Sequence, residues 1–180
     1  SELKSAIKYS RTHKTAVISD ECYLEFGNTV EPQSILKFTQ GQNSNILAVH
    51  SLSKRSSMAG YRGAFVIGDS ALIKKILEIR KHAGMMVPLP IQHAMIAALS
   101  DDKHVAIQRD RYNKRRQQLI PALESIGFTI DFSDAGLYIW CTRGEDSWKS
   151  VESLAKLGIL VTPGIFYGAD GGEHVRIAMT

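Results

Sequence analysis

The sequence has very little cysteine, and its two cysteines show no arrangement typical of a chemical site. Cys22 and Cys141 lie far apart in the 180 residues. They form neither a CxxC pair nor a Cys/His spacing of the kind that binds zinc. This pattern excludes a disulfide-rich secreted scaffold and fits a protein kept in a reducing compartment. We therefore expect a cytoplasmic protein that holds no metal.

The sequence also lacks long apolar runs and a strong excess of one charge. No stretch approaches the roughly 18 apolar residues that a membrane-spanning helix needs, and the first residues do not follow the pattern of a signal peptide. The formal net charge is +4, and hydrophobic residues make up 44% of the chain. Such a balance is ordinary for a globular protein with a buried core. We expect no membrane partner.

Neither end of the sequence has the polar taper of a natural terminus. A helical pattern begins at once, with Leu3 and Ile7 on one face, and the last residue, Thr180, follows an apolar run typical of a strand. We therefore expect the chain to be a fragment, or the ordered part of a longer protein.

Apolar runs and helical patterns alternate in the first hundred residues. Three continuous apolar runs are typical of strands buried on both faces of a sheet: 15–19, 46–49 and 64–67. A helix is predicted from Asp69 to about His82, followed by a proline-bounded loop and a second helix over 91–99. We predict that residues 1–100 form part of an α/β domain with a mixed, mostly parallel sheet.

The remaining residues have a different pattern. One long polar helix is predicted over 103–125, after which Gly127 gives a C-cap signal. The elements expected beyond it are strands near 128–131, 136–142, 159–162 and 175–179 and a helix near 147–157. We predict that residues 101–180 form a smaller α+β C-terminal domain, which includes the long helix as the connection between the two domains.

Polar side chains of complementary chemistry follow or precede the three strands of the first domain. The first strand leads to Asp20 and Tyr23, the second runs into Ser51, Ser53 and Lys54, and Arg62 stands just before the third. Ligands of open α/β sheets bind outside the carboxyl ends of the strands. We therefore expect these side chains to converge at one edge of the sheet.

This set of groups is what pyridoxal 5′-phosphate (PLP) requires. A lysine amine attacks the cofactor aldehyde, a carboxylate keeps the pyridine nitrogen protonated, and a phenol hydrogen-bonds the ring oxygen. The phosphate needs hydroxyl donors and a guanidinium, whose fixed fork of donors suits it better than an ammonium does. The sequence therefore predicts a PLP site.

The segments SDECY, HSLSK and AGYRG resemble the cofactor-binding signature of the class I/II aminotransferases, which have PLP-transferase fold type I. The resemblance implies a catalytic role for Lys54, which forms the Schiff base with PLP and later carries a proton. It implies that Asp20 pairs with the pyridine nitrogen and Tyr23 with the ring oxygen. The phosphate-binding residues that it implies are Ser51, Ser53 and Arg62.

The C-terminal residues carry the same resemblance. AGLYIW is similar to a strand of the family's small domain, and TPGIFYG to its Pro-Gly-x-x-Phe-Gly loop. Arg176, in HVRI, matches the arginine that binds the α-carboxylate of the substrate. The resemblance spans nearly all 180 residues, but it includes neither the family's N-terminal half nor its final helix.

Within the family, MVPLPIQHAMIAALSDD, AGLYIWCTRGE and GILVTPGIFYG resemble most the actinobacterial type of N-succinyldiaminopimelate aminotransferase. That resemblance implies amino transfer between an amino acid, glutamate, and a 2-oxo acid in lysine and diaminopimelate biosynthesis. It also implies a cytoplasmic homodimer.

Three alternatives stay open. A PLP carbon–sulfur lyase shares the site residues but eliminates a β-substituent. The cations of 109–116 would suit a cofactor-free domain that binds nucleic acid, but the intervening Asp110 and Tyr112 favour a solvated face of the long helix. We therefore expect no nucleic-acid partner. The third alternative is an inactive piece that keeps the fold. His50 and Cys22, beside the site residues, are expected to be packing residues.

Overall fold

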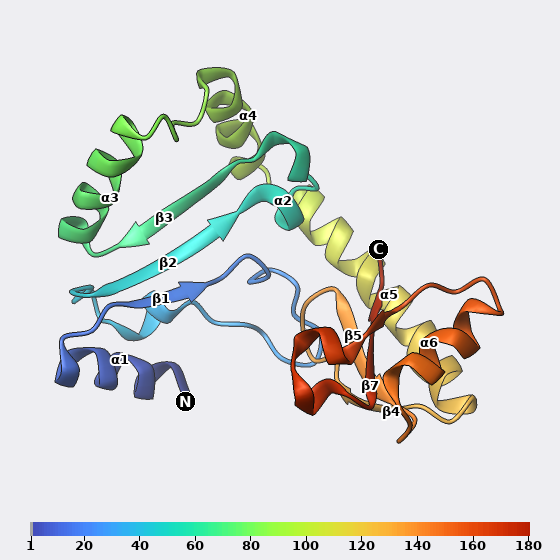
Figure 1. The fold of residues 1–180 in the computed structure, drawn as a ribbon. Coiled ribbons are helices and arrows are strands. Elements are labelled where there is room, and N and C mark those ends of the chain that lie inside the picture. Colours follow the sequence, from blue (N-terminus) through green and yellow to red (C-terminus); the bar gives the residue numbers. More distant parts are fainter. Residues whose placement is uncertain (1) are drawn as a thin grey trace. The chain divides into compact units, whose positions relative to one another are not determined.

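The structure, a computed structural model, describes residues 2–180 and divides into two compact units (Figure 1). Unit 1 consists of the chain up to Glu25 together with Pro32–Val105. Unit 2 consists of Phe26–Glu31 together with Ala106–Thr180.

A short segment from the first hundred residues belongs to unit 2, which the predicted domain over 1–100 did not anticipate. Gly27 forms an antiparallel β-bridge with Ala135. The Asn28 amide donates a hydrogen bond to the Asp134 carbonyl oxygen at 2.9 Å. These partners are far apart in sequence, so no local pattern could indicate the pairing.

Unit 1 is built around a three-stranded sheet with the order β1-β2-β3. Its strands are β1 (Val17–Asp20), β2 (Ile46–Ser51) and β3 (Ala64–Gly68). β1 runs parallel to β2, and β3 runs antiparallel to it. The predicted mixed sheet is therefore confirmed, although only one of the two described pairings is parallel.

The central strand of this sheet is the buried one. Ile46 and Ala48 of β2 are fully buried and share a core with Ile35. The outer strands were also predicted to be buried on both faces, and this is wrong: Ile18 of β1 is 63% exposed and Ile67 of β3 is 41% exposed. Both are edge strands of the described sheet, so one flank of each has no neighbouring strand.

The longer helices of unit 1 begin close to where their sequence signals predict. The helices are α1 (Glu2–His13), α2 (Leu52–Arg55), α3 (Ser70–His82) and α4 (Leu89–Leu99), with 3-10 helices η1 (Ile35–Phe38) and η2 (Ala59–Tyr61). Asp69 is the N-cap of α3, because its carboxylate accepts hydrogen bonds from the amides of Ala71 and Leu72. Nowhere in residues 2–180 is a helix both long and apolar enough to cross a bilayer.

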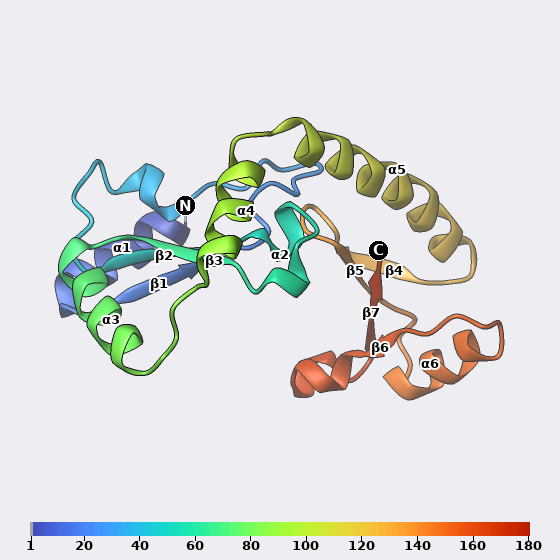
Figure 2. The ribbon, with the colours of Figure 1, turned by 90° about the horizontal axis from the view of Figure 1, so that it is seen from above.

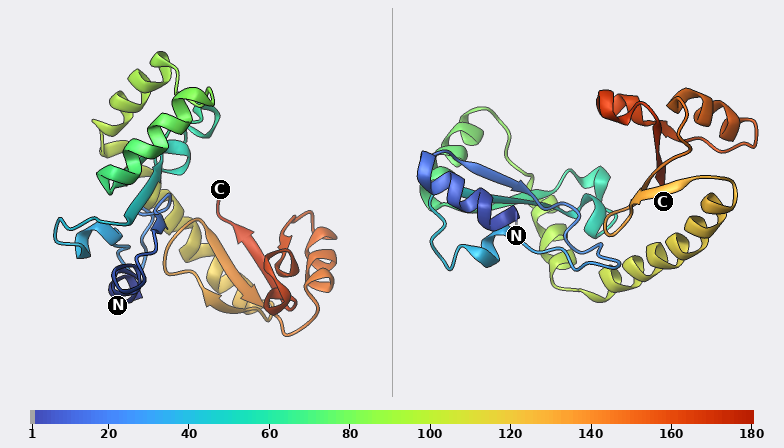
Figure 3. Two further views of the ribbon diagram at one scale, coloured as in Figure 1. Left: turned by 60° about the vertical axis from the view of Figure 1, so that its left-hand side comes forward. Right: turned by 90° about the horizontal axis from the view of Figure 1, so that it is seen from below.

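Unit 2 contains a four-stranded sheet with the order β4-β5-β7-β6, in which every pairing is antiparallel. Its elements are β4 (Thr129–Phe132), β5 (Tyr138–Thr142), β6 (Thr162–Pro163), β7 (His174–Ala178), the helix α6 (Ser147–Ala155) and, from Ala106 on, the helix α5 (Lys103–Ser125). Leu123 of α5 and Leu154 of α6 form a core with Ile139 and Val175. The ribbons of α5 and α6 are seen beside the strands in Figures 2 and 3. The two helices thus pack against one face of the sheet.

The other face of this sheet carries polar and aromatic side chains. Successive residues of a strand point to opposite faces, so Trp140 and Arg176 lie opposite the core formed by Ile139 and Val175. Trp140 and Arg176 are direct partners in the pairing of β5 with β7. This register puts an arginine beside aromatic rings on the solvent-facing side of the sheet.

The predicted strand over 159–162 is wrong for most of its length. β6 is only Thr162–Pro163, and Leu160 is 87% exposed. The Ile159 amide donates a hydrogen bond to the Leu154 carbonyl oxygen at 3.0 Å, and Gly158 has a φ of +79°. The apolar run therefore begins in the turn that terminates α6.

Two glycines let the loop after β6 approach itself closely. A Cβ atom on Gly164 would lie 2.3 Å from the Gly171 carbonyl oxygen and 2.8 Å from Cη2 of Trp140. Such distances leave no space for a methyl group. The glycine of the TPGIFYG segment is therefore required by packing.

Replacing Gly164 with alanine is expected to destabilise the protein, because the added methyl group overlaps Gly171 and Trp140. Overpacking of this kind costs about 1–3 kcal/mol. Denaturant unfolding of the full-length protein measures the effect. Gly60→Ala is the matched control, since a Cβ there meets nothing within 4 Å. Equal losses of stability in the two variants would contradict the packing account.

Candidate active site

The strand pairing of unit 1 brings the segments that carry the predicted site residues to one edge of the sheet. β1 ends at Asp20, which pairs with Val49, two residues before Ser51. Ser51 in turn pairs with Ala64, two residues after Arg62. Adjacent strands lie about 4.8 Å apart, so these three strand ends occupy one short stretch of the edge (Figure 1).

α2 begins directly after β2 and carries the predicted Schiff-base lysine. Ser51 is its N-cap: the Ser51 hydroxyl accepts a hydrogen bond from the Ser53 amide at 3.1 Å and donates one to the Ser53 hydroxyl at 2.9 Å. Lys54 follows within this single turn and is half-buried. Two hydroxyls and an amine thus share one strand-to-helix junction, whose helical turn the sequence did not predict.

Asp20 is an exposed carboxylate whose negative charge is stabilised locally. Hydrogen bonds from the thiol and the amide of Cys22 lower the pKa of Asp20 below its ordinary 3.8. Asp20 is therefore an anion at neutral pH, as a partner of a protonated pyridine nitrogen must be. Burial and the neighbouring carboxylate raise the pKa of Cys22 to about 11. The thiol is thus neutral and unreactive, which agrees with its predicted packing role.

Arg62 has an unusual backbone conformation and an accessible guanidinium. It ends η2 in the left-handed region, with φ 56° and ψ 33°. A residue other than glycine in this region costs about 1–2 kcal/mol, and strain of this kind is concentrated at functional sites. Nη1 donates to the Ala59 carbonyl oxygen at 2.8 Å. The exposed remainder of the guanidinium fork can meet an anion. Tyr23, beyond the end of β1, is 36% exposed.

The half-buried His50 and the buried Glu21 form a pair beside the predicted site residues. Nε2 of His50 lies 3.2 Å from Oε2 of Glu21, which is 6% exposed. The imidazole also stacks on Phe65, with 5.1 Å between ring centroids. Oε1 of Glu21 accepts a hydrogen bond from the Ile35 amide at 2.8 Å. The pair links β2 to the segment after β1, as expected of a packing histidine.

In unit 2, Arg176 lies in an aromatic pocket of about 330 Å³ that Phe132, Tyr138 and Trp140 help to line. The guanidinium carbon is 4.2 Å from the ring centroid of Tyr138 and 5.0 Å from that of Tyr167. These cation–π contacts hold the guanidinium over the rings without using its N–H donors.

One of these donors is left over. Nε of Arg176 is buried and has no hydrogen-bond partner within residues 2–180. An unpaired buried donor costs about 1–3 kcal/mol, which a ligand that accepts the hydrogen bond would remove. A carboxylate accepts two parallel bonds from a guanidinium. The pocket therefore suits the predicted binding of a substrate carboxylate.

The cations of 109–116 do not all lie on a solvated face, which corrects that part of the prediction. Arg116 is 1% exposed. It donates to Oδ1 of Asn113 at 2.6 Å, to Oγ of Ser133 at 2.9 Å and to the Gly136 carbonyl oxygen at 2.7 Å. Burial lowers the pKa of Arg116. This arginine holds the loop between β4 and β5 and is unavailable to nucleic acid.

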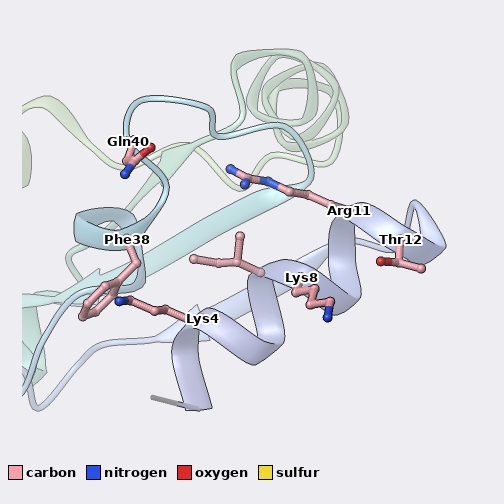
Figure 4. A pocket seen from close by; sticks show the side chains of 7 residues that line it. Lys4, Lys8, Arg11, Thr12, Phe38 and Gln40 are labelled. Carbon is pink, nitrogen blue, oxygen red and sulfur yellow. The ribbon is translucent and has the colours of Figure 1, made fainter.

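A separate concavity lies between α1 and the η1 segment and contains none of the predicted site residues (Figure 4). Lys4, Lys8 and Arg11 line it. The Lys4 ammonium lies 5.7 Å from the ring centroid of Phe38. Arg11 donates to the carbonyl oxygens of Thr39 and Gln42. The cations of this surface groove are thus partly engaged with the chain itself.

The donor set at the sheet edge fits PLP. Asp20, Lys54 and Arg62 form no ion pair with one another or with any other part of residues 2–180. An anion, an amine and a guanidinium thus remain available for the pyridine nitrogen, the aldehyde and the phosphate. No group of three histidine, cysteine, aspartate or glutamate side chains in the described chain is placed to hold a metal ion.

Comparison with known sequences gives one family. The profile described as aminotransferase class I and II matches residues 1–180. A probable aminotransferase of Mycobacterium tuberculosis is 53% identical over 180 residues, which are 99% of this chain and 43% of that protein. A 4-dedimethylamino-4-oxo-anhydrotetracycline transaminase of Streptomyces rimosus is 51% identical over 99% of this chain and 50% of its own length.

More distant relatives and solved structures that this chain resembles are also aminotransferases. An LL-diaminopimelate aminotransferase of Dehalococcoides mccartyi is 32% identical over 98% of this chain and 47% of its own length. A crystal structure of an aminotransferase from Neisseria meningitidis superimposes with a TM-score of 0.87 at 33% identity, over 98% of this chain and 48% of that one. The chain spans about half the length of the curated relatives it matches.

Arg176→Lys is expected to weaken the binding of carboxylate substrates about tenfold or more, because a charged hydrogen bond is worth about 1.5–3 kcal/mol and lysine lacks the guanidinium fork. The KM for an amino acid, measured in an aminotransferase assay of the full-length protein, reports the effect. The control is Arg143→Lys, which changes an arginine paired with Glu145 outside the pocket. An unchanged KM in the Arg176 variant would rule out the carboxylate role.

Proposed function

The chain belongs to the class I and II aminotransferase family, and on that premise we propose that the protein uses PLP to transfer an amino group between an amino acid and a 2-oxo acid. One observation carries the proposal. An anion, an amine and a guanidinium come from three strand ends that meet at one edge of the sheet, and they have no ion-pair partners within residues 2–180. PLP carries a pyridine nitrogen, an aldehyde and a phosphate, and these three side chains supply one suitable partner for each.

The proposed cofactor contacts follow from the chemistry of each side chain. The Asp20 carboxylate, which is an anion at neutral pH, keeps the pyridine nitrogen protonated. The hydroxyls of Ser51 and Ser53 and the guanidinium of Arg62 hold the phosphate. The phenol of Tyr23 donates to the ring oxygen. The Lys54 amine bonds to the aldehyde.

Bound PLP supplies an electron sink for the pair of electrons left when the α-proton of the substrate is removed. The Lys54 amine would act as the general base that takes this proton and would hold it until it is returned. Lys54 is half-buried. The proposed role of Arg176 is to bind the carboxylate of the substrate.

We propose that the specific reaction interconverts N-succinyldiaminopimelate and its oxo counterpart, and that in the physiological direction glutamate donates the amino group to the oxo compound and leaves as 2-oxoglutarate. The support is the resemblance of three segments to that type of aminotransferase and the 32% identity to LL-diaminopimelate aminotransferase. This substrate places the protein in lysine and diaminopimelate biosynthesis. The same resemblance supports a cytoplasmic homodimer in which residues 1–100 belong to the PLP-binding domain.

A second candidate substrate is a polycyclic aromatic ketone. Two observations favour it: the 51% identity to a transaminase named for an anhydrotetracycline ketone, and the aromatic walls that Phe132, Tyr138 and Trp140 give to the pocket of Arg176. Aromatic rings can stack on such walls. Either candidate is compatible with the same cofactor contacts.

Borohydride reduction of the full-length protein with PLP is expected to attach a pyridoxyl group to Lys54, since this amine lies at the junction with the phosphate-binding hydroxyls. Peptide mass mapping locates the adduct. Lys4→Ala, in the groove of Figure 4, is the control that should keep it, whereas Lys54→Ala should lose it. An adduct on another lysine would refute the proposed cofactor site.

A donor panel with 2-oxoglutarate as acceptor tests the substrate. Glutamate formation is expected to be at least about tenfold more efficient with N-succinyldiaminopimelate than with unmodified diaminopimelate, because an active site that binds the succinyl group leaves polar groups unpaired without it. A preference for unmodified diaminopimelate as the donor would overturn the assignment of N-succinyldiaminopimelate. A preference for the amine that corresponds to the anhydrotetracycline ketone would favour the second candidate substrate instead. Release of ammonia and a thiol from a β-substituted amino acid would indicate a lyase.

A further inference from the structure

The helical turn that carries Lys54 is too short to be stable alone. α2 consists of four residues, Leu52–Arg55, and isolated helices shorter than about 12–15 residues are marginal in water. Leu52 is fully buried and anchors one side of the turn. The Lys54 amine, by contrast, must point out of the packed interior to reach a cofactor. A residue other than Lys54 therefore has to fix the C-terminal end of this turn.

Arg55, the residue directly after Lys54, makes that connection. It is 9% exposed. Nε donates to Oε1 of Glu25 at 3.2 Å, Nη1 donates to the Ala98 carbonyl oxygen at 3.0 Å, and Nη2 donates to Oδ1 of Asp102. All of these partners belong to unit 1. All three guanidinium nitrogens are therefore used to tie α2 to other segments.

The partners of Arg55 come from two different parts of unit 1. Glu25 ends the segment that begins with Asp20 and includes Tyr23. Ala98 and Asp102 lie at the end of α4 and just beyond it. Arg55 thus connects the turn of the proposed Schiff-base lysine to the segment of the proposed pyridine partner and to the helix behind both.

A second link runs parallel to this one. Nε2 of His104 lies 2.9 Å from Oγ of Ser56, and Nδ1 of the same ring lies 3.0 Å from Oδ2 of Asp101. This link reaches the same α4–α5 connection but does not reach Glu25. Arg55 therefore makes a connection from α2 to the segment of Asp20 that the His104 link does not make.

We propose that Arg55 is a positioning residue, which sets the reach of the Lys54 amine relative to the Asp20 carboxylate. The inference rests on the proposed function, since it assumes that Lys54 bonds to PLP. A lysine at position 55 would keep the charge but lose the planar fork that reaches three acceptors in different directions. By fixing the turn that carries Lys54, the buried Arg55 would restrict the positions that the Lys54 amine can take.

The test uses the full-length protein with PLP and three variants, Arg55→Met, Arg55→Lys and Glu25→Gln. Arg55→Met is expected to weaken PLP affinity about tenfold to a hundredfold, as loss of residues that orient metal ligands does. It should also move the pH midpoint of the visible absorbance of bound PLP, because the amine and the carboxylate are no longer held together. Arg55→Lys should recover part of both effects. Glu25→Gln should show the same changes in weaker form.

Arg143→Met is the matched control. Arg143 also pairs with a glutamate, Glu145, and donates to a serine hydroxyl, that of Ser153. It belongs to unit 2, so its loss is expected to change thermal unfolding without changing PLP affinity or the pH midpoint. Thermal unfolding of the PLP-free variants is measured alongside, to separate lost stability from lost positioning.

The outcomes separate the two proposals. If the wild-type protein gives no pyridoxyl adduct on Lys54, the proposed function fails. If the adduct forms but Arg55→Met and Glu25→Gln keep the wild-type PLP affinity and pH midpoint while unfolding earlier, Arg55 only stabilises the fold and the positioning role is overturned. If Arg55→Met does not fold, Arg55→Lys and Glu25→Gln decide the question by the same two readouts.

Discussion

The position of β2, between a parallel and an antiparallel neighbour, is the constraint on which the candidate site depends. The parallel neighbour aligns the end of β1, at Asp20, with the end of β2. The antiparallel neighbour returns the chain so that Arg62 precedes a strand that starts beside Ser51. A slip of one residue would turn every side chain of a strand to the other face. The buried residues Ile46 and Ala48 resist such a slip.

Three arginines, the buried Arg55 and Arg116 and the half-buried Arg176, show how the same group can serve different purposes. Arg55 and Arg116 donate hydrogen bonds to carboxylate, carbonyl and hydroxyl oxygens of the chain, so each holds separate segments together. Arg176 instead rests on aromatic rings and keeps a buried Nε without a partner in residues 2–180. Unpaired donors are costly, which makes Arg176 the one suited to an incoming carboxylate.

Local signals predicted much of the fold, and contacts between distant residues account for what they missed. The carboxylate of Asp69 caps α3 as its position indicates, and Lys54 follows directly after β2, the strand predicted to lead to it. The run 159–162 is apolar and was predicted to be a strand, but its first residue, Ile159, lies in the turn that terminates α6. Neither the pairing of Phe26–Glu31 with unit 2 nor the burial of Arg116 has a local signature. Both depend on partners that only the folded chain brings near.

A crystal structure of the full-length protein with PLP tests the central claim most directly. The account predicts electron density continuous from Nζ of Lys54 to the cofactor, the pyridine nitrogen against the Asp20 carboxylate, and the phosphate within hydrogen-bond distance of Ser51, Ser53 and Arg62. A cofactor whose phosphate lies against other residues, or whose ring nitrogen faces away from Asp20, would contradict it.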